Sequence, residues 1–257
     1  SLSLTGVAEI PLVIYLAQRP GPGTGVPTYT AQGDLNVALD SGHGEFERLV
    51  VAPGDAVETQ ELTSQAFYFS QKYKMPSIVL GDKHLGESFY ASEKEPVITK
   101  SKKTTSLKKY NGNEITEEGE TTSNAEIVQE NFNRRLKKFE DVEEESEKFC
   151  KFKIHGNKES KNVVVGWGST KGAIIDAIKD LDCKFIQVLY LEPFAKEIKE
   201  ELEKAEKIIL VENNSTGQLG ELISKKTGIF IDDKILKYNG RPFFCDELKK
   251  EISGRLK

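Results

Sequence analysis

The part of the sequence best suited to chemistry is a loop that combines one arginine with several glycines and prolines. Residues 18–34 read Gln-Arg-Pro-Gly-Pro-Gly-Thr-Gly-Val-Pro-Thr-Tyr-Thr-Ala-Gln-Gly-Asp. Its prolines restrict the backbone, and its glycines permit unusual φ angles. The loop follows the apolar run of residues 12–17, and open α/β sheets bind ligands at the carboxyl ends of their strands. Arg19 therefore indicates a site for a carboxylate or phosphate, with a tight surface turn and an Arg19 salt bridge as the alternative.

A second glycine-containing loop imitates a dinucleotide-binding fingerprint. Residues 166–172 read Gly-Trp-Gly-Ser-Thr-Lys-Gly, follow a strand-like run and open a helical pattern. Glu192 ends the next strand, about where a ribose-binding acid would lie. The spacing is nevertheless G-x-G-x-x-x-G, with Lys171 where the third glycine normally falls. A nicotinamide-dependent oxidoreductase using this loop stays open as an alternative to a tight strand-to-helix turn at a domain or subunit contact.

The histidines and cysteines predict neither a metal site nor an iron–sulfur cluster in this chain. They are scattered, at His43, His84, His155, Cys150, Cys183 and Cys245. Zinc and iron–sulfur sites need closely spaced ligands, so we expect no metal ligand here. The thiols are interpreted as reduced and inert, and His43 as the histidine best placed to line an active-site entrance. Lys83 and Arg241 are interpreted as solvated charges.

The elements that must position these loops alternate between strands and helices. Strands are predicted at residues 12–17, 48–52, 77–80, 163–166, 185–191 and 208–212. Helices are predicted at residues 34–39, 56–74, 124–147, 171–180, 193–205, 218–226 and 246–257. Strand–helix–strand order with short turns indicates an α/β fold with parallel sheets. The continuous apolar run at residues 12–17 is typical of a strand buried on both faces.

A change in composition divides the chain into two α/β domains. Residues 1–95 form the first domain and residues 151–257 the second. Between them, residues 96–150 comprise a charged linker and a bridging helix. We interpret the stretch from Glu93 to about Ser123 as an exposed, partly disordered connection, because it holds many charges and few large apolar residues.

Composition restricts the class of protein and its partners. Hydrophobic residues make up 37% of the 257 residues and charged residues 30%, which suits a cytoplasmic protein with an ionised surface. The net charge of -5 argues against nucleic acid as a partner. No apolar run is long enough to span a membrane, and no signal peptide is recognised.

The loop motifs form an ordered series along the chain. In the first domain these are Arg19-Pro-Gly-Pro-Gly-Thr-Gly-Val-Pro-Thr28, Gln32-Gly-Asp-Leu35, Ser41-Gly-His-Gly-Glu45 and Ala52-Pro-Gly-Asp55. In the second they are Val164-Val-Gly-Trp-Gly-Ser-Thr-Lys-Gly172 and Val211-Glu-Asn-Asn214. The series resembles the alpha subunits of archaeal and bacterial 2-oxoacid:ferredoxin oxidoreductases, and only the connection at about 95–123 diverges. The resemblance implies the back half of a thiamine-pyrimidine-type domain followed by a transketolase C-terminal-like domain that serves assembly.

The resemblance also implies cofactors and partners. Enzymes of this family bind thiamine diphosphate and Mg²⁺ between an alpha and a beta subunit, and the beta subunit holds the diphosphate and the metal. They decarboxylate a 2-oxoacid, transfer the acyl group to coenzyme A and pass electrons through iron–sulfur clusters of partner subunits to ferredoxin. Gamma and delta subunits or domains are further expected partners. The Arg-Pro-Gly-Pro loop resembles the 2-oxoglutarate and broad or branched-chain 2-oxoacid branches more than the pyruvate-specific one.

Residue roles follow the same resemblance. It implies that Arg19 holds the substrate carboxylate, and a bidentate clamp would orient the ketone. Thr24, Thr28 and Thr30 are candidates for the same pocket, with turn-stabilising hydroxyls as the alternative. No catalytic residue and no metal ligand is expected in this chain.

One large departure limits what the chain can do alone. Nothing in residues 1–10 matches the Tyr-Pro-Ile-Thr-Pro motif, or the glutamate that activates thiamine, in the N-terminal half of these subunits. We therefore expect an incomplete thiamine site. A non-catalytic assembly subunit without substrate contact is a further alternative.

Overall fold

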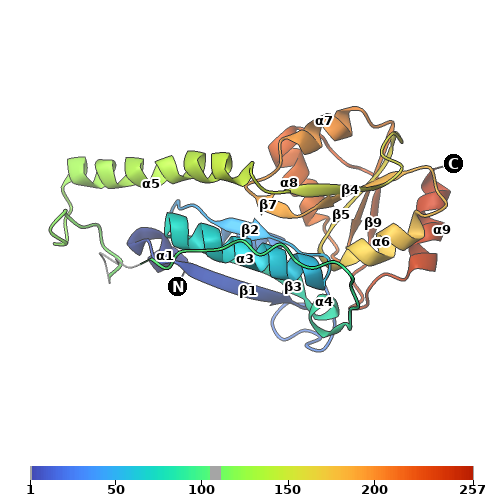
Figure 1. Cartoon of the computed structure of the whole chain (residues 1–257), viewed down its shortest axis with the longest axis horizontal. Helices are drawn as coiled ribbons and strands as arrows, with labels where there is room; N and C mark the ends of the chain where they lie inside the picture. The colour runs from blue at the N-terminus through green and yellow to red at the C-terminus, as the bar shows by residue number, and fades with distance from the viewer. Residues whose placement is uncertain (1, 105–110, 257) are drawn as a thin grey trace.

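The computed structural model describes residues 2–104 and 111–256, and within these residues it contains two mostly parallel sheets with helices packed on them (Figure 1). The first sheet has the strand order β1 (Leu12–Gln18), β3 (Pro76–Asp82), β2 (Leu49–Val51) and β7 (Tyr190–Glu192). Strands β1, β3 and β2 are parallel, and β7 is antiparallel to β2. The helices of this half are α1 (Leu2–Ala8), α2 (Leu35–Asp40), α3 (Ala56–Tyr73) and α4 (Lys83–Glu87).

The second sheet has the strand order β4 (Phe152–Gly156), β6 (Lys184–Val188), β5 (Asn162–Trp167), β8 (Lys207–Glu212) and β9 (Lys234–Leu236). All neighbouring strands are parallel except β4 and β6. Its helices are the short 3-10 helix η1 (Gly168–Thr170), α6 (Lys171–Ala177), α7 (Glu197–Glu203), α8 (Gln218–Thr227) and α9 (Cys245–Arg255). The long helix α5 (Ala125–Ser146) lies beside the first half of the molecule (Figure 1), where its Val142 packs in one buried cluster with Leu49 and Val79 of the first sheet. The predicted α/β fold with two parallel-sheet units is confirmed.

The predicted strand at residues 185–191 is wrong in one respect, because the chain uses it in both sheets. Residues 184–188 pair with β5 and β4 in the second sheet. Only two residues later, Tyr190 and Glu192 pair with β2 in the first sheet. The apolar composition of residues 185–191 does not indicate that the two halves of this run pair in different sheets. This crossing ties the two sheets together, and the domain bounds at residues 95 and 150 stay a prediction.

The apolar packing also joins the sheets. One cluster of buried side chains combines Ile78 and Leu80 of β3 with Val163 and Val165 of β5. Helices α7 and α8 complete this cluster with Ile198, Leu202, Leu219 and Ile223. The sheets therefore share a continuous core, which fixes their relative position.

The apolar run of β1 predicted a strand buried on both faces, and this prediction is wrong. It is the edge strand of the first sheet among the described residues, and Leu12 and Tyr15 are exposed by 36% and 49%. An edge strand lacks a neighbour that would cover its outer side chains. Because β1 pairs with β3 over its whole length, its carboxyl end is still firmly placed beside that of β3.

The describable part of the charged connection includes residues that contact α3, whose first turn is capped by Asp55: the Asp55 carboxylate accepts a 2.8 Å hydrogen bond from the Glu58 amide. Residues 97–104 follow α3 as an extended strap (Figure 1), with Val97, Thr99 and Thr104 donating their amides to side chains of that helix. Residues 105–110, which belong to the stretch predicted to be partly disordered, lie outside the described residues. No helix among the described residues is both long and apolar enough to cross a membrane.

Candidate functional site

The Arg19 loop, defined here as residues 19–33, leaves β1 at the carboxyl edge of the first sheet, beside α4 (Figure 1). Buried Gln18 fixes both ends of it. Its side-chain amide donates to the Gly81 carbonyl at 3.2 Å, and its side-chain carbonyl accepts from the Asp34 amide at 3.0 Å. The loop thus starts and finishes at one point of the sheet, and the residues between must project from that edge.

Within the loop, a tight backbone turn supports Arg19. The Val26 amide donates to the Pro20 carbonyl at 3.0 Å, and Gly25 adopts φ 50°. A Cβ at Gly25 would overlap the Pro20 carbonyl, so this turn requires glycine. Arg19 itself is exposed, and its guanidinium donates to the Gly23 carbonyl at 3.3 Å. That contact uses one N–H and leaves most of the guanidinium's five donors available for an anion.

The four predicted site residues do not all line one pocket. Thr28 and Thr30 line a pocket of about 290 Å³ whose other walls include His84 of α4 and Arg241 of the loop after β9. Thr24 is exposed at the loop tip, and neither it nor Arg19 lines this pocket. Thr30 is buried and structural in part, since its hydroxyl accepts from the His84 amide at 3.4 Å. The predicted roles of Arg19 and the three threonines stay predictions.

A buried carboxylate lies directly behind this pocket. Asp82 ends β3, caps α4 by accepting from the Leu85 amide at 2.9 Å, and accepts a hydrogen bond from the Ser169 hydroxyl. Burial raises the pKa of Asp82, although hydrogen bonds from Ser169, Leu85 and Thr30 oppose that rise. Ser169 belongs to the second sheet's Gly166 loop, defined here as residues 166–171. The carboxyl edges of the two sheets therefore face each other.

A side chain from the first half of the molecule occupies the space beside the Gly166 loop. Gln32, which is fully buried, donates from its side chain to the Trp167 carbonyl at 2.8 Å and accepts from the Asn213 amide at 2.9 Å. Gly168 has φ 57°, and a Cβ on it would lie 2.9 Å from the Gln32 side-chain nitrogen. A dinucleotide fingerprint needs this space for a pyrophosphate, so the geometry is against the nicotinamide alternative.

Two charged residues of the supposed fingerprint also have other partners. Lys171 forms ion pairs with Asp55 and with buried Glu58, the latter at 2.6 Å. Glu192 does not end β6 next to the Gly166 loop; it lies in β7 of the first sheet and pairs with Lys226 at 2.6 Å. The loop is therefore a contact between the two halves, which was the other interpretation of its sequence.

Glu58 is the centre of that contact. Its carboxylate accepts from Lys153 at 2.8 Å, from the Gln187 amide group at 2.7 Å and from the Gly54 amide at 2.8 Å, besides Lys171. Burial alone would raise its pKa, but the two lysines outweigh burial and lower it. The charge stays paired inside the molecule, and its role is structural.

The second-domain motif Val211-Glu-Asn-Asn214 is likewise structural here. Glu212 is fully buried and accepts from the Trp167 indole at 3.1 Å, from Asn214 at 2.7 Å and from the Leu219 amide at 2.9 Å. Burial raises its pKa against the effect of these donors. The donors to this carboxylate among the described residues belong to the second half of the chain, so it holds the start of α8 rather than a ligand.

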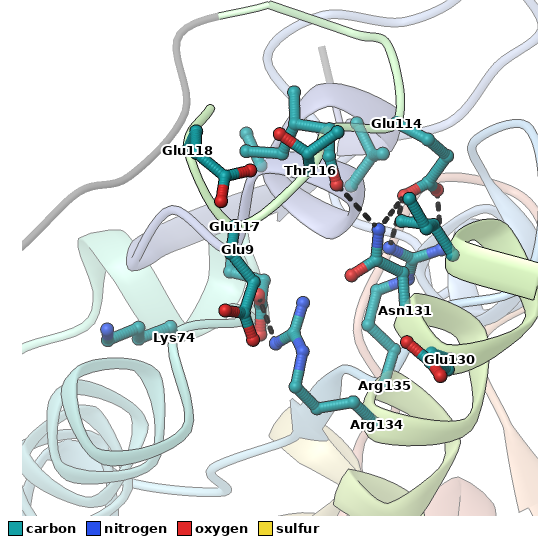
Figure 2. Close-up of a pocket in the computed structure, with 14 residues that line it drawn as sticks. Glu9, Lys74, Glu114, Thr116, Glu117, Glu118, Glu130, Asn131, Arg134 and Arg135 are labelled. Carbon is teal, nitrogen blue, oxygen red and sulfur yellow. Dashed lines mark hydrogen bonds and ion pairs between the residues drawn. The ribbon is translucent and has the colours of Figure 1, made fainter. Parts of the chain in front are cut away.

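A pocket with a larger volume than the Thr28–Thr30 pocket lies elsewhere. It has about 640 Å³ and is bounded by α1, the turn at residues 114–118 and α5 (Figure 2). The labelled charges meet one another: Arg134 pairs with Glu9 at 2.5 Å, and Arg135 with Glu114 at 2.6 Å. Glu9 precedes β1, whereas the Arg19 loop follows it, and seven strand residues span about 20 Å. Size alone therefore does not make this pocket the candidate site.

The described residues of the structure support neither a metal site nor a reactive Cys183 thiol. Within residues 2–104 and 111–256, no group of three or more His, Cys, Asp or Glu side chains is arranged to hold a metal ion. Burial raises the pKa of Cys183 to about 11, which disfavours a thiolate. His43 donates its backbone amide to Ser3 at 2.6 Å and does not line the Thr28–Thr30 pocket.

Two residues of the pocket were interpreted from the sequence only as solvated charges. Arg241 is exposed, as predicted, and its guanidinium also stacks on the Tyr29 ring at 3.7 Å from the centroid. Lys83, predicted likewise, lies in the pocket wall and pairs with Glu87 at 2.5 Å. No local pattern links Tyr29 with Arg241, because only the docking of the two sheets brings them together.

Comparison with known proteins places this geometry in a family. Residues 1–154 match the family model of the pyruvate flavodoxin/ferredoxin oxidoreductase thiamine diphosphate-binding domain. The chain is 35% identical to the alpha subunit of the 2-oxoacid:ferredoxin oxidoreductase of Saccharolobus solfataricus, over 97% of this chain and 45% of the relative. It is 25% identical to the 2-oxoglutarate synthase subunit KorA of Methanocaldococcus jannaschii, over 96% of this chain and 75% of the relative.

A solved structure shares the fold. The 2-oxoglutarate:ferredoxin oxidoreductase of Magnetococcus marinus, solved with 2-oxoglutarate, coenzyme A and succinyl-CoA bound, superimposes with a TM-score of 0.81 at 22% identity. The match covers all of this chain and 50% of that one. The chain thus spans about half the length of the first relatives it matches. It belongs to the pyruvate flavodoxin/ferredoxin oxidoreductase family, and its sequence is of the alpha-subunit type found in 2-oxoacid:ferredoxin oxidoreductases.

Proposed function

We propose that this chain is the substrate-facing part of an alpha subunit in a 2-oxoacid:ferredoxin oxidoreductase. The complete enzyme oxidatively decarboxylates a 2-oxoacid, either 2-oxoglutarate or a broad range, forms an acyl-CoA and passes electrons to ferredoxin. The observation that carries the proposal is Arg19: an exposed guanidinium with one internal hydrogen bond, at the carboxyl edge of a parallel sheet. Both the family match and the relatives' names support the reaction class.

The role proposed for Arg19 is to hold the carboxylate of the 2-oxoacid. A guanidinium presents two parallel N–H donors that match a carboxylate. Fixing that group also fixes the neighbouring ketone, which must meet its reaction partner in one orientation. The turn closed at Gly25 and the two hydrogen bonds of Gln18 hold the Arg19 backbone, so little freedom is lost on binding.

The cofactors are proposed to lie mainly outside this chain. Its described residues offer no cluster for Mg²⁺ and therefore do not fit a thiamine diphosphate–metal site by themselves, and we derive no step through the cofactor. A beta subunit would hold the diphosphate and the metal, and iron–sulfur clusters would belong to partner subunits, with gamma or delta subunits among them. Coenzyme A is the proposed acyl acceptor, and the cytoplasm the proposed compartment.

The test uses the complete protein, co-expressed and purified with its partner subunits. The assay follows the reduction of a low-potential dye that depends on both a 2-oxoacid and coenzyme A. Arg19→Ala should lower kcat/KM for the 2-oxoacid by about a hundredfold, because a charge-assisted contact to the substrate is lost. Arg19→Lys should fall in between, since it keeps the charge without the planar fork.

A matched control separates loss of binding from loss of structure. Arg134→Ala removes an arginine whose ion pair with Glu9 lies at the other end of β1 and should leave the rate within about twofold. The melting temperature of Arg19→Ala should equal that of the wild type. An assembled wild-type enzyme that ignores every 2-oxoacid would refute the function, and full activity of Arg19→Ala would refute the role of Arg19.

A further inference from the structure

The second half of the chain contributes a guanidinium, that of Arg241, to the Thr28–Thr30 pocket, which Arg19 does not line. Arg241 follows β9, yet it lines the pocket together with Thr28 and Thr30 of the Arg19 loop. Its ring contact with Tyr29, at 3.7 Å, holds the guanidinium plane against that loop. Among the described residues, no hydrogen bond or ion pair of this guanidinium is found, whereas Lys83 beside it is paired with Glu87. Arg241 is thus a positioned cation with its donors available.

Backbone contacts fix the position of Arg241 relative to the Arg19 loop. The Thr30 amide donates to the Gly240 carbonyl at 3.2 Å. Gly240 has φ 79°, and a Cβ there would lie 3.2 Å from Tyr29 and 3.4 Å from Pro20, the neighbour of Arg19. Asn213 also donates to the Arg241 carbonyl at 3.2 Å. The segment is therefore docked on the substrate loop and does not merely pass near it.

We propose that Arg241 binds the second carboxylate of a 2-oxo dicarboxylic acid, so that the second half of the chain selects the substrate. This inference rests on the proposed function. In it, Arg19, which lies outside the Thr28–Thr30 pocket, holds the carboxylate next to the ketone, and Arg241 holds the carboxylate at the far end of the side chain, inside the pocket. The pocket of about 290 Å³ is at the small end of ligand sites, which suits a short aliphatic acid. A 2-oxoacid with an apolar side chain would leave the Arg241 guanidinium unpaired, so Arg241 would not increase the affinity for that acid.

The same chemistry would suit a phosphate of coenzyme A, and the test distinguishes the two anions. The complete enzyme, assembled with its partners, is assayed with 2-oxoglutarate and with 2-oxobutyrate at varied concentrations of each and of coenzyme A. Arg241→Gln should lower kcat/KM for 2-oxoglutarate by about ten- to hundredfold, mainly through KM, and change that for 2-oxobutyrate by less than about threefold. The KM for coenzyme A should stay unchanged.

Two further variants keep the result interpretable. Arg241→Lys retains the charge and should recover part of the preference for 2-oxoglutarate. Tyr29→Leu removes the ring on which the guanidinium stacks and should weaken the same preference in the same direction, even if Arg241→Gln fails to assemble. An unchanged ratio of the two substrates in an active Arg241→Gln enzyme would overturn the inference, as would a rise confined to the KM for coenzyme A. A wild-type enzyme inactive on both acids would instead overturn the proposed function.

Discussion

The Arg19 loop and the Gly166 loop occupy equivalent places, each following a strand at the carboxyl edge of its sheet, but they use their polar groups differently. In the Gly166 loop, Lys171 is paired with Asp55 and Glu58, Ser169 donates to Asp82, and the Trp167 carbonyl accepts from Gln32. In the Arg19 loop, the side-chain donors of Arg19 are mostly unused. The Gly166 loop has satisfied its polar groups inside the molecule, whereas the Arg19 loop presents Arg19 outward, although its Thr30 and Gln32 also have partners inside.

The difference shows why a glycine motif at the right edge of a sheet does not by itself identify a binding site. Both loops contain glycines with positive φ, at Gly25 and at Gly168. Glycine permits a close approach, but the approaching group can be a ligand or another part of the chain. At Gly168 it is the side chain of Gln32. What distinguishes a candidate site is therefore an exposed donor with few internal partners.

The largest effect expected from breaking the contact at the Gly166 loop comes from Glu58→Ala. It leaves Lys171 and Lys153 without their carboxylate and should lower the free energy of unfolding by about 3–5 kcal/mol, as for other broken buried pairs. Urea unfolding followed by the fluorescence of Trp167, the only tryptophan of the chain, measures this.

The matched control is Glu206→Ala, in which the lost partner of Lys161 is 68% exposed. That pair should contribute less than about 1 kcal/mol. Equal losses in the two variants would show that the contact around Glu58 has no special structural weight.

Acid should weaken the same contact. The folded pKa of Glu58 lies below its ordinary value of 4.5, since Lys171 and Lys153 outweigh the effect of burial. The carboxylate's contribution to stability is thus present above pH 4.5 and lost as the pH falls below it through the folded pKa. The difference in unfolding free energy between wild type and Glu58→Gln should shrink over that interval. A difference that is constant from pH 7 to about pH 3 would contradict the paired state of Glu58.

Local patterns predicted most of the elements, because their causes are local. The predicted helix at residues 56–74 and the predicted strands at residues 77–80 and 208–212, found as α3, β3 and β8, depend on near neighbours in the sequence. The α/β class and the edge that carries Arg19 follow from their order. The family resemblance added the carboxylate role of Arg19, which no periodicity contains.

The failures have a common physical origin in contacts between distant segments. Residues 185–191 were predicted as one strand, but residues 184–188 pair in the second sheet and Tyr190 and Glu192 pair in the first. Strand β1 was predicted to be buried, but burial depends on what lies beside it. Arg241 is exposed, as predicted, but its contact with Tyr29 depends on the docking of Gly240 on the Arg19 loop, which no local pattern contains.

A smaller effect is expected from placing alanine at two glycines, Gly25 in the Arg19 loop and Gly172 in α6, directly after the Gly166 loop. At Gly25 an alanine would need a left-handed backbone, costing about 1–2 kcal/mol, and would overlap the Pro20 carbonyl. The loop should rearrange, so that kcat/KM for the 2-oxoacid falls clearly while the melting temperature changes little. Gly172, in α6, has open space around its Cβ position, and Gly172→Ala should be neutral or stabilising. Full activity of Gly25→Ala would show that the turn does not position Arg19.

The smallest effect is expected from adding NADH, which should not bind and should give no saturable change in fluorescence. The position that a pyrophosphate would need beside Gly168 is held by Gln32, which makes hydrogen bonds to both Trp167 and Asn213. A dinucleotide would have to displace these bonds and leave buried polar groups unpaired. Fluorescence titration of the chain should therefore show no saturable binding up to about 1 mM NADH, a concentration that would detect an affinity of about 4 kcal/mol. Saturable NADH binding that becomes tighter in Gln32→Gly would mean that the Gly166 loop is a ligand site which Gln32 occupies when no ligand is bound. The proposed difference between the two loops would then be wrong.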